Sequence, residues 1–362
     1  MSTSCYIIAE AGVNHDGDLQ KAHLLVDIAA DAGADAVKFQ LFVPELLVTG
    51  QAPTATYQSK NLKDDAISQQ AMLQKLTLPA EAMIELATYC QSKKIDFLCT
   101  PFEHQSLKIL TERTKMRYLK LASGEVTNGP LLLASARTGL PIILSTGMSN
   151  LDEIGIALSI LHFGYSHKAG SPQPLSQPTA DMLAALKDKV TLLHCVSQYP
   201  APIHLTNLKA METIAKRFGL PIGLSDHTVG ITMSVAAAAR GASVIEKHFS
   251  YDVKATGPDH SASLSAGELK AMAAAIREVE SGLGNGEKHC QAEERNTLSI
   301  ARRSVVAAYP IEKGEKFSEQ NLICKRPATG PVSPNQYWQL LGKPAKSGYA
   351  ADDFIQADEL KD

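Results

Sequence analysis

Short apolar and β-branched runs alternate with longer amphipathic segments through residues 1–282 of this 362-residue chain. Eight such runs, each followed by a segment of helical periodicity, predict parallel strands joined by helices. The count and the length favour a closed (β/α)8 TIM barrel over an open doubly wound sheet, because no G-x-G-x-x-G turn follows the first run. The expected strands cover residues 6–9, 36–39, 96–99, 118–121, 141–145, 190–194, 221–224 and 243–246.

Three further segments differ from this pattern. Residues 43–78 follow the second expected strand, on the face where barrel active sites form, and we interpret them as a substrate-covering lobe. Residues 283–298 are polar and are expected to form a linker. Residues 299–362 show short alternating runs with turn residues, which predict a small β-rich domain. A module of about 60 residues is marginally stable alone, so we expect it to dock on a barrel.

Composition excludes several classes of function. The formal net charge of -3 offers no basic field for nucleic acid. No run approaches the ~18 apolar residues of a membrane helix, so no membrane partner is expected. None of the six cysteines forms a C-x-x-C pair, which favours reduced thiols in a cytoplasmic protein over a disulfide scaffold or a zinc cluster.

Polar residues follow nearly every expected strand. A lone strand lysine is more often an ion-paired or solvated residue, but a series at the same end of eight strands is typical of a barrel active site. The series contains Glu10, Lys38, Gln40, Thr100, Lys120, Ser123, Ser197, Tyr199, Ser225, His227, Glu246 and His248, with Asp259 in the segment after the last strand.

These side chains divide by charge. Lys38, Lys120, Ser123 and Ser225 offer cations and hydrogen-bond donors that suit a phosphate and a carboxylate. Three carboxylates are available to handle a proton or a water molecule. They are Glu10, Glu246 and Asp259.

His227 and His248 occupy equivalent ends of adjacent expected strands, which is suitable geometry for a two-histidine metal site. With water and carbonyl oxygens completing the shell, such a site suits Mn²⁺ or Mg²⁺ better than zinc. Alternatively, each histidine bonds a backbone carbonyl in a purely structural role.

Two other functions remain open from the residues alone. A metal-independent Schiff-base aldolase needs a lysine of lowered pKa, and Lys38 and Lys120 could neighbour each other. A metal pair would be redundant in that enzyme. A non-catalytic carbohydrate-binding protein is the second alternative, although a binding-only descendant should have lost some of the polar strand ends.

Taken together, the motifs resemble the N-acetylneuraminate (sialic acid) synthase family, including legionaminate and pseudaminate synthases. CKRP at 324–327 and LGK at 341–343 resemble that family's C-terminal SAF domain, an antifreeze-like β-clip module. The barrel motifs are IAEAGVNHDG at 8–17, VKFQ at 37–40, CTPF at 99–102, LKLASGE at 119–125, STGM at 145–148, LSDHT at 224–228, IEKHF at 245–249 and GPDH at 257–260.

The resemblance implies a reaction. Family members condense phosphoenolpyruvate with an N-acylated mannose-type sugar, giving a nine-carbon 2-keto acid and phosphate. The expected activity is that of an N-acetylneuraminate synthase, and the alternative is a legionaminate synthase that uses 2,4-diacetamido-2,4,6-trideoxymannose. The stretch 55–58 and the GPDH motif resemble these two groups more than the pseudaminate group.

The resemblance also implies residue roles. His227 and His248 would hold Mn²⁺ or Mg²⁺, and Arg326 would reach the sugar's acyl group across a domain-swapped homodimer. Ser197 stands where some members have asparagine, which leaves its contact with phosphoenolpyruvate open. The implied phosphoenolpyruvate set is Lys38, Thr100, Lys120, Ser123, Ser197 and Ser225; the catalytic set is Glu10, Tyr199, Glu246 and Asp259; the sugar set is Gln40, Asp259 and Arg326.

Overall fold

The computed structural model describes residues 4–55, 58, 61, 68–173 and 175–361. The chain divides into two compact units, Met1–Gly284 and Asn285–Asp362. Among the described residues, no helix is both long enough and apolar enough to cross a bilayer.

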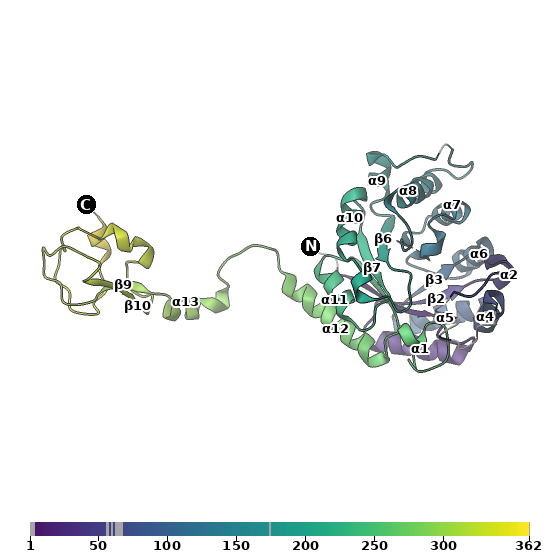
Figure 1. The fold of residues 1–362 in the computed structure, drawn as a ribbon, viewed down its shortest axis with the longest axis horizontal. Coiled ribbons are helices and arrows are strands. Elements are labelled where there is room, and N and C mark those ends of the chain that lie inside the picture. The colour runs from purple at the N-terminus through teal and green to yellow at the C-terminus, as the bar shows by residue number, and fades with distance from the viewer. Residues whose placement is uncertain (1–3, 56–57, 59–60, 62–67, 174, 362) are drawn as a thin grey trace. The chain divides into compact units, whose positions relative to one another are not determined.

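The first unit is built on an eight-stranded sheet in which every adjacent pair of strands is parallel (Figure 1). The strand order is β3-β2-β1-β8-β7-β6-β5-β4, and β3 and β4 at its two ends lie side by side. The sheet is therefore closed, and the predicted (β/α)8 barrel is confirmed. The strands are β1 (Tyr6–Gly12), β2 (Ala36–Leu41), β3 (Asp96–Pro101), β4 (Leu119–Leu121), β5 (Ile142–Ser145), β6 (Val190–Cys195), β7 (Ile222–Asp226) and β8 (Val244–His248).

Helices surround the sheet, and their ends follow local sequence. Asn150 and Glu153 form a capping box that begins α8, while Gly219 at φ 66° ends α10 in the left-handed region. The helices are α1 (Leu19–Asp31), α2 (Pro44–Leu47), α4 (Gln69–Leu76), α5 (Ala80–Lys93), α6 (His104–Arg113), α7 (Gly129–Arg137), α8 (Leu151–Ser166), α9 (Ala180–Leu186), α10 (Lys209–Phe218), α11 (Thr232–Ala239) and α12 (Ala266–Leu283), with 3-10 turns η1 (Ser123–Glu125), η2 (Ile203–Leu205) and η3 (His260–Ala262).

The barrel has two apolar layers, and the smaller one positions the site. The larger core lies between the sheet and its helices. A separate cluster fills the inside of the barrel with Ile8, Ala36, Leu98, Ile143, Leu193 and Val244. Because side chains alternate along a strand, the residue two places further on also points inward. That residue is Glu10 after Ile8, Lys38 after Ala36 and Glu246 after Val244, so polar groups lie directly above the apolar plug.

The described part of residues 43–78 forms a small apolar cluster with the strand ends. Met72 and Leu76 of α4 pack with Val13 and Phe42. The Nδ2 of Asn61 donates to the carbonyl of Pro258 at 2.6 Å, which links this lobe to the segment after β8. Thr56 and Tyr57 of the 55–58 stretch lie outside the described residues.

The second unit has its own apolar core around an antiparallel pair of strands, as predicted for a small β-rich domain. Val305 and Ala307 of β9 and Leu322 of β10 contribute to that core. Helix α13 begins within residues 283–298, which were expected to be only a linker, because the Gln291 and Glu294 side chains cap the preceding turn. The elements are η4 (Ala292–Glu294), α13 (Arg295–Ala301), β9 (Ser304–Ala307), β10 (Leu322–Lys325), η5 (Pro334–Gln339) and η6 (Ala357–Leu360).

Candidate active site

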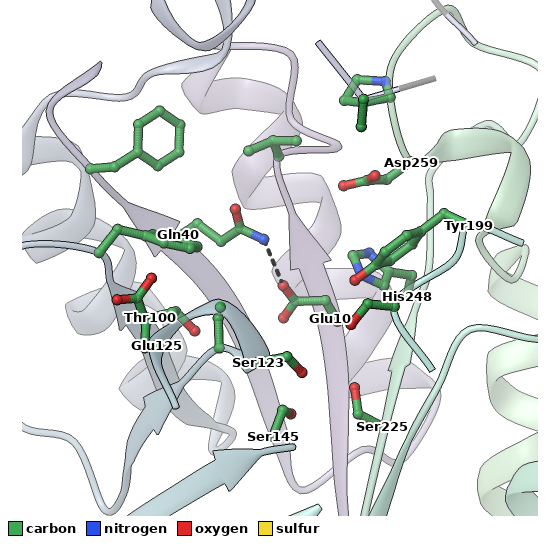
Figure 2. Close-up of a pocket in the computed structure, with 18 of the residues that line it drawn as sticks. Glu10, Gln40, Thr100, Ser123, Glu125, Ser145, Tyr199, Ser225, His248 and Asp259 are labelled. Atoms are coloured by element: carbon green, nitrogen blue, oxygen red, sulfur yellow. Dashed lines mark hydrogen bonds between the residues drawn. The ribbon is translucent and has the colours of Figure 1, made fainter. Parts of the chain in front are cut away.

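A cavity of about 480 Å³ lies at the carboxyl end of the barrel strands (Figure 2). It is lined by all the predicted barrel residues, whereas Arg326 belongs to the second unit, where it is exposed. The predicted residues that line the cavity are Glu10, Lys38, Gln40, Thr100, Lys120, Ser123, Ser197, Tyr199, Ser225, His227, Glu246, His248 and Asp259.

Two lysines face one carboxylate in this cavity. Lys120 Nζ lies 3.4 Å from Glu246 Oε1, and Lys38 Nζ lies 3.6 Å from Glu246 Oε2. Hydroxyl groups complete the arrangement: Lys120 donates to Ser145 Oγ at 2.8 Å, and Ser225 Oγ donates to Glu246 at 2.8 Å. The lysines and their hydroxyl neighbours form a compact group of donors suited to a phosphate or a carboxylate.

Burial acts differently on these three charges. It lowers the pKa of Lys120, whereas for Lys38 the contacts with Glu10 and Glu246 outweigh burial and raise the pKa. Burial alone would raise the pKa of Glu246, but Lys120 and Lys38 overcome it and lower the pKa to about 2. Glu246 is therefore a permanent counter-ion of the lysines at neutral pH.

Glu10 differs from Glu246 although both are buried. Its Oε2 lies 2.6 Å from Lys38 Nζ, and Gln40 donates to its Oε1 at 3.2 Å. Burial outweighs the attraction of Lys38, and the nearby Glu246 charge adds to it, so the pKa of Glu10 rises to about 7. Such a carboxyl exchanges a proton readily near neutral pH, as a general acid or base requires.

Ser123 and Ser197 converge beside Gly147. The Gly147 N–H donates to Ser123 Oγ at 2.9 Å. A methyl group on Gly147 would lie 2.3 Å from Ser197 Oγ and 2.9 Å from Ser123 Oγ. Glycine is therefore required for these hydroxyls to approach the backbone after β5. Ser197, whose role the asparagine departure left open, does reach the cavity.

His227 and His248 lie together, with their ring centroids 5.5 Å apart. Tyr199 packs on both rings, with centroid distances of 4.1 Å to His227 and 5.7 Å to His248. His227 Nδ1 lies 2.9 Å from the carbonyl of Val196. This contact orients the ring, and Nε2 is the ring nitrogen that remains for a ligand. His248 Nδ1 is buried without a hydrogen-bond partner among the described residues.

The two imidazoles fit an open metal site. Burial and the neighbouring His227 hold the pKa of His248 well below its ordinary value, so its imidazole is neutral, as a metal ligand must be. Burial would lower the pKa of His227, but its contact with Cys195 outweighs burial and raises that pKa, so His227 would have to lose its proton to bind the ion. The Val196 carbonyl fixes the orientation of His227, as outer hydrogen bonds do for metal-ligating histidines. Among the described residues, no cluster of three or more His, Cys, Asp or Glu side chains has metal-binding geometry. A pair of imidazoles could hold an ion that takes its other ligands from the oxygen atoms of water or substrate.

Asp259 approaches the cavity from the segment after β8. Burial raises its pKa to about 6. The segment is fixed by His260, whose Nε2 lies 2.9 Å from Asp16 Oδ1 and whose Nδ1 lies 2.7 Å from Ser250 Oγ. A methyl group on Gly257 would lie 2.5 Å from the His260 ring, which explains glycine at the start of GPDH.

The cavity also has an apolar wall, opposite in character to the lysine group. It is supplied by the strand ends, α2 and α4. A sugar bearing methyl or acetyl groups would bury apolar surface against it. The residues of this wall are Val13, Phe42, Leu47, Val48, Met72, Leu73, Leu76 and Phe102.

Several cavity residues were not among the predicted side chains, and three of them carry a hydroxyl, carboxyl or thiol group at the strand ends. They are Ser145 and Glu125, which appear above only within motifs, and Cys195, whose thiol was expected only to be reduced. Their inward alternation along β5 and β6, and the position of Glu125 just after β4, are signals that could have identified them. Asn128 donates to Glu125 at 2.7 Å, and burial raises the pKa of this carboxyl.

Comparison with known proteins agrees with this geometry. Residues 25–288 match the NeuB family and residues 302–361 match the SAF domain. The N,N'-diacetyllegionaminic acid synthase of Campylobacter jejuni is 45% identical over 97% of this chain and 98% of its own length. The enzyme of the same name from Legionella pneumophila is 41% identical over 94% of this chain and 90% of its own.

A solved structure gives the same result. The N-acetylneuraminic acid (sialic acid) synthetase of Leptospira borgpetersenii, solved in complex with citrate, matches 82% of this chain and 91% of its own. Its TM-score is 0.67 at 32% sequence identity. On its family match, its relatives and its fold, the chain belongs to the NeuB family of sialic acid synthase-type enzymes and carries the family's SAF domain.

Proposed function

We propose that this enzyme condenses phosphoenolpyruvate with an N-acylated mannose-type sugar to give a nine-carbon 2-keto acid and phosphate. The observation that carries the proposal is the pairing of Lys38 and Lys120 around Glu246 in the same cavity as the two histidines. The lysines offer a region for a phosphorylated acid, and the two histidines offer a second region for an aldehyde that a bound ion would polarise.

The reaction assigns each group a task. The enol carbon of phosphoenolpyruvate attacks the sugar aldehyde carbon, water adds at the carbon that bears phosphate, and the bond to phosphate then breaks. Lys38, Lys120 and the hydroxyls of Ser123 and Ser225 hold the phosphate and carboxylate. Glu10, with a pKa of about 7, exchanges the proton of the aldehyde oxygen or of the attacking water.

The remaining residues support the sugar. Gln40, which is hydrogen-bonded to Glu10, and Asp259 are available to bond its hydroxyls, and Tyr199 holds the histidine rings. His227 and His248 would bind Mn²⁺ or Mg²⁺, which when bound supplies Lewis-acid polarisation of a carbonyl oxygen.

We propose 2,4-diacetamido-2,4,6-trideoxymannose as the sugar in preference to N-acetylmannosamine. The names of the Campylobacter and Legionella relatives support this choice. The apolar wall supports it independently, because a terminal methyl group gains burial there and a hydroxymethyl group loses hydration. Apolar pockets reject an added hydroxyl by only about 10²-fold, so weaker turnover of N-acetylmannosamine is expected.

We further propose a domain-swapped homodimer in which Arg326 reaches the sugar's acyl group in the partner barrel. The family resemblance and the SAF match support this assignment. Six cysteines without disulfides support a cytoplasmic location. A variant Arg326→Ala should raise KM for the sugar and leave KM for phosphoenolpyruvate unchanged.

A Schiff-base aldolase is the second candidate, favoured by the lowered pKa of Lys120. Borohydride reduction in the presence of substrate distinguishes the two. An aldolase gives a lysine adduct visible by mass spectrometry, whereas the proposed synthase gives none and loses activity with a chelator.

The direct test is phosphate release from phosphoenolpyruvate with Mn²⁺ and each of the two sugars, with a chelator control. We expect metal-dependent release with both sugars and a higher kcat/KM for the trideoxy sugar. Release that persists after complete metal removal would contradict the proposed mechanism, and equal kcat/KM values would contradict the sugar assignment. His248→Ala should abolish turnover, and near-normal activity of that variant would rule out the metal role.

A further inference from the structure

A second buried charge pair lies on the outer side of β7 and β8, at the ends that lead to His227 and His248. Asp226 of β7 and Lys247 of β8 are direct register partners, with Oδ2 and Nζ 2.9 Å apart. Both side chains are completely inaccessible to solvent. They face the layer between the sheet and the helices, since Ser234 of α11 also donates to Asp226 at 2.7 Å.

Both members of the pair make further hydrogen bonds. Asp226 Oδ1 accepts the backbone N–H of Thr228 at 2.9 Å and its hydroxyl at 2.7 Å. Lys247 Nζ also donates to the Thr228 carbonyl. Three elements, β7, β8 and α11, are therefore joined with the segment that leaves β7.

The same level of the neighbouring strands is apolar. Lys247 is the register partner of Ala9 on β1, which in turn pairs with Val37 on β2, and Val37 pairs with Phe97 on β3. All three are buried. At this level of the sheet, β1, β2 and β3 carry apolar side chains. The ionic pair occurs on β7 and β8, whose ends lead to the two histidines.

Each histidine follows one member of the pair. Asp226 precedes His227 and Lys247 precedes His248, and alternation turns the histidines into the cavity while the charges face outward. The ionic pair thus joins the two strand ends at the residues directly before the imidazoles.

We propose that Asp226 and Lys247 are positioning residues that set the separation of His227 and His248 and thereby the affinity for the divalent ion. This inference rests on the proposed metal role of the histidines. A buried ion pair is often no more stabilising than an apolar pair of similar volume, so its retention here is better explained by geometric specification than by stability. Outer contacts of metal ligands change metal affinity or activity by about 10–100-fold when removed.

The test measures Mn²⁺ binding by the full-length protein, using the electron paramagnetic resonance signal of free Mn²⁺. The double variant Asp226→Asn with Lys247→Met removes both charges and retains an acceptor for Thr228. We expect its Kd for Mn²⁺ to rise at least about tenfold, with KM for phosphoenolpyruvate unchanged. A folded double variant with unchanged Mn²⁺ affinity would overturn the inference.

A matched control is provided by Arg277, whose 2.7 Å ion pair with Asp35 lies beside the start of β2. Arg277→Met should lower the melting temperature without changing Mn²⁺ affinity, which separates positioning from general stability. If the double variant does not fold, Ser234→Ala replaces it as the test, because this variant removes one hydrogen bond to Asp226. The inference requires the Kd for Mn²⁺ to rise about two- to threefold in Ser234→Ala, and an unchanged Kd refutes it.

The variant His227→Ala separates this inference from the proposed function. If His227→Ala binds Mn²⁺ as tightly as the parent, the histidine site itself is wrong. If His227→Ala loses binding while the folded double variant keeps it, the metal site stands and only the positioning role of Asp226 and Lys247 is refuted.

Discussion

The two sides of β7 and β8 bury charge in different ways. On the inner side, Glu246 Oε2 and His248 Nδ1 have no hydrogen-bond partner among the described residues, although both are buried. On the outer side, both carboxylate oxygens of Asp226 and the Nζ of Lys247 are hydrogen-bonded within one network. A buried polar group without a partner is costly and requires an explanation, whereas a satisfied one requires none.

This difference separates reactive from supporting residues better than residue type does. Lysine, aspartate or glutamate occur on both sides, at similar burial. The inner groups keep bonding capacity for a ligand, and the outer groups have already used theirs. Variants on the two sides should therefore lose different properties.

The largest effects are expected from replacing one buried lysine on each side, Lys120 on the inner side and Lys247 on the outer side. Lys120→Met should lower kcat/KM for phosphoenolpyruvate by about 10³-fold, because it removes a charge from the reacting site, and should change stability less, because Lys38 and Ser225 still face Glu246. Lys247→Met should cost about 3–5 kcal/mol of unfolding free energy, because it leaves Asp226 charged and buried. Phosphate-release kinetics and urea unfolding measure the two quantities. Equal stability losses would abolish the distinction between the two sides.

Glu10 gives the next largest effect, and its pH dependence is specific. With a pKa of about 7, the free enzyme's carboxyl is mostly protonated in weak acid, so kcat/KM should rise as pH increases through about 7 if Glu10 accepts a proton. Glu10→Gln should lower kcat/KM by about 10²-fold or more and remove that rise. A variant that retains the same pH profile would show that another group titrates.

A smaller effect is expected at Gly147, on the inner side. Gly147→Ala places a methyl group 2.3 Å from Ser197 Oγ, so the hydroxyl must move. Loss of about one hydrogen bond, or about 1.4 kcal/mol, corresponds to a tenfold higher KM for phosphoenolpyruvate. An unchanged KM in the purified variant would exclude Ser197 and Ser123 from that site.

The smallest effect is the glycine control in the outer helix layer. A methyl group on Gly267 of α12 meets no atom within 4 Å. Gly267→Ala should therefore raise stability by up to about 1 kcal/mol through helix propensity, with kcat/KM unchanged. Thermal unfolding beside kinetics of the same preparation tests this, and a loss of activity would mean that glycine substitutions act non-specifically in this barrel.

The sequence was sufficient to predict the strands and the inner cluster, because both depend on local alternation. Lys38 and Glu246 could be assigned to the cavity once their strands were identified. The paired roles of Asp226 and Lys247 could not, because which strand residues are direct partners depends on the register between β7 and β8. Both were visible only as members of the LSDHT and IEKHF motifs.

Other features depend on approach between distant segments. The contact of Asn61 with Pro258 spans 197 residues, and no local pattern encodes it. The opposite pKa shifts of Glu10 and Glu246 require their positions relative to two lysines, which composition does not contain. Helix α13 was missed because its polar sequence lacks the apolar period that reveals longer helices.

The placement of Lys38 between the carboxyl groups of Glu10 and Glu246 has a calorimetric consequence. A phosphorylated dianion that settles against the lysines adds negative potential at a carboxyl already poised near neutrality, so the affinity of that carboxyl for hydrogen ions increases. Substrate capture is then accompanied by net uptake of hydrogen ions from the medium. The apparent heat of binding therefore varies with the ionisation enthalpy of the buffer. The enzyme takes up hydrogen ions from solution before the first covalent bond of the reaction forms.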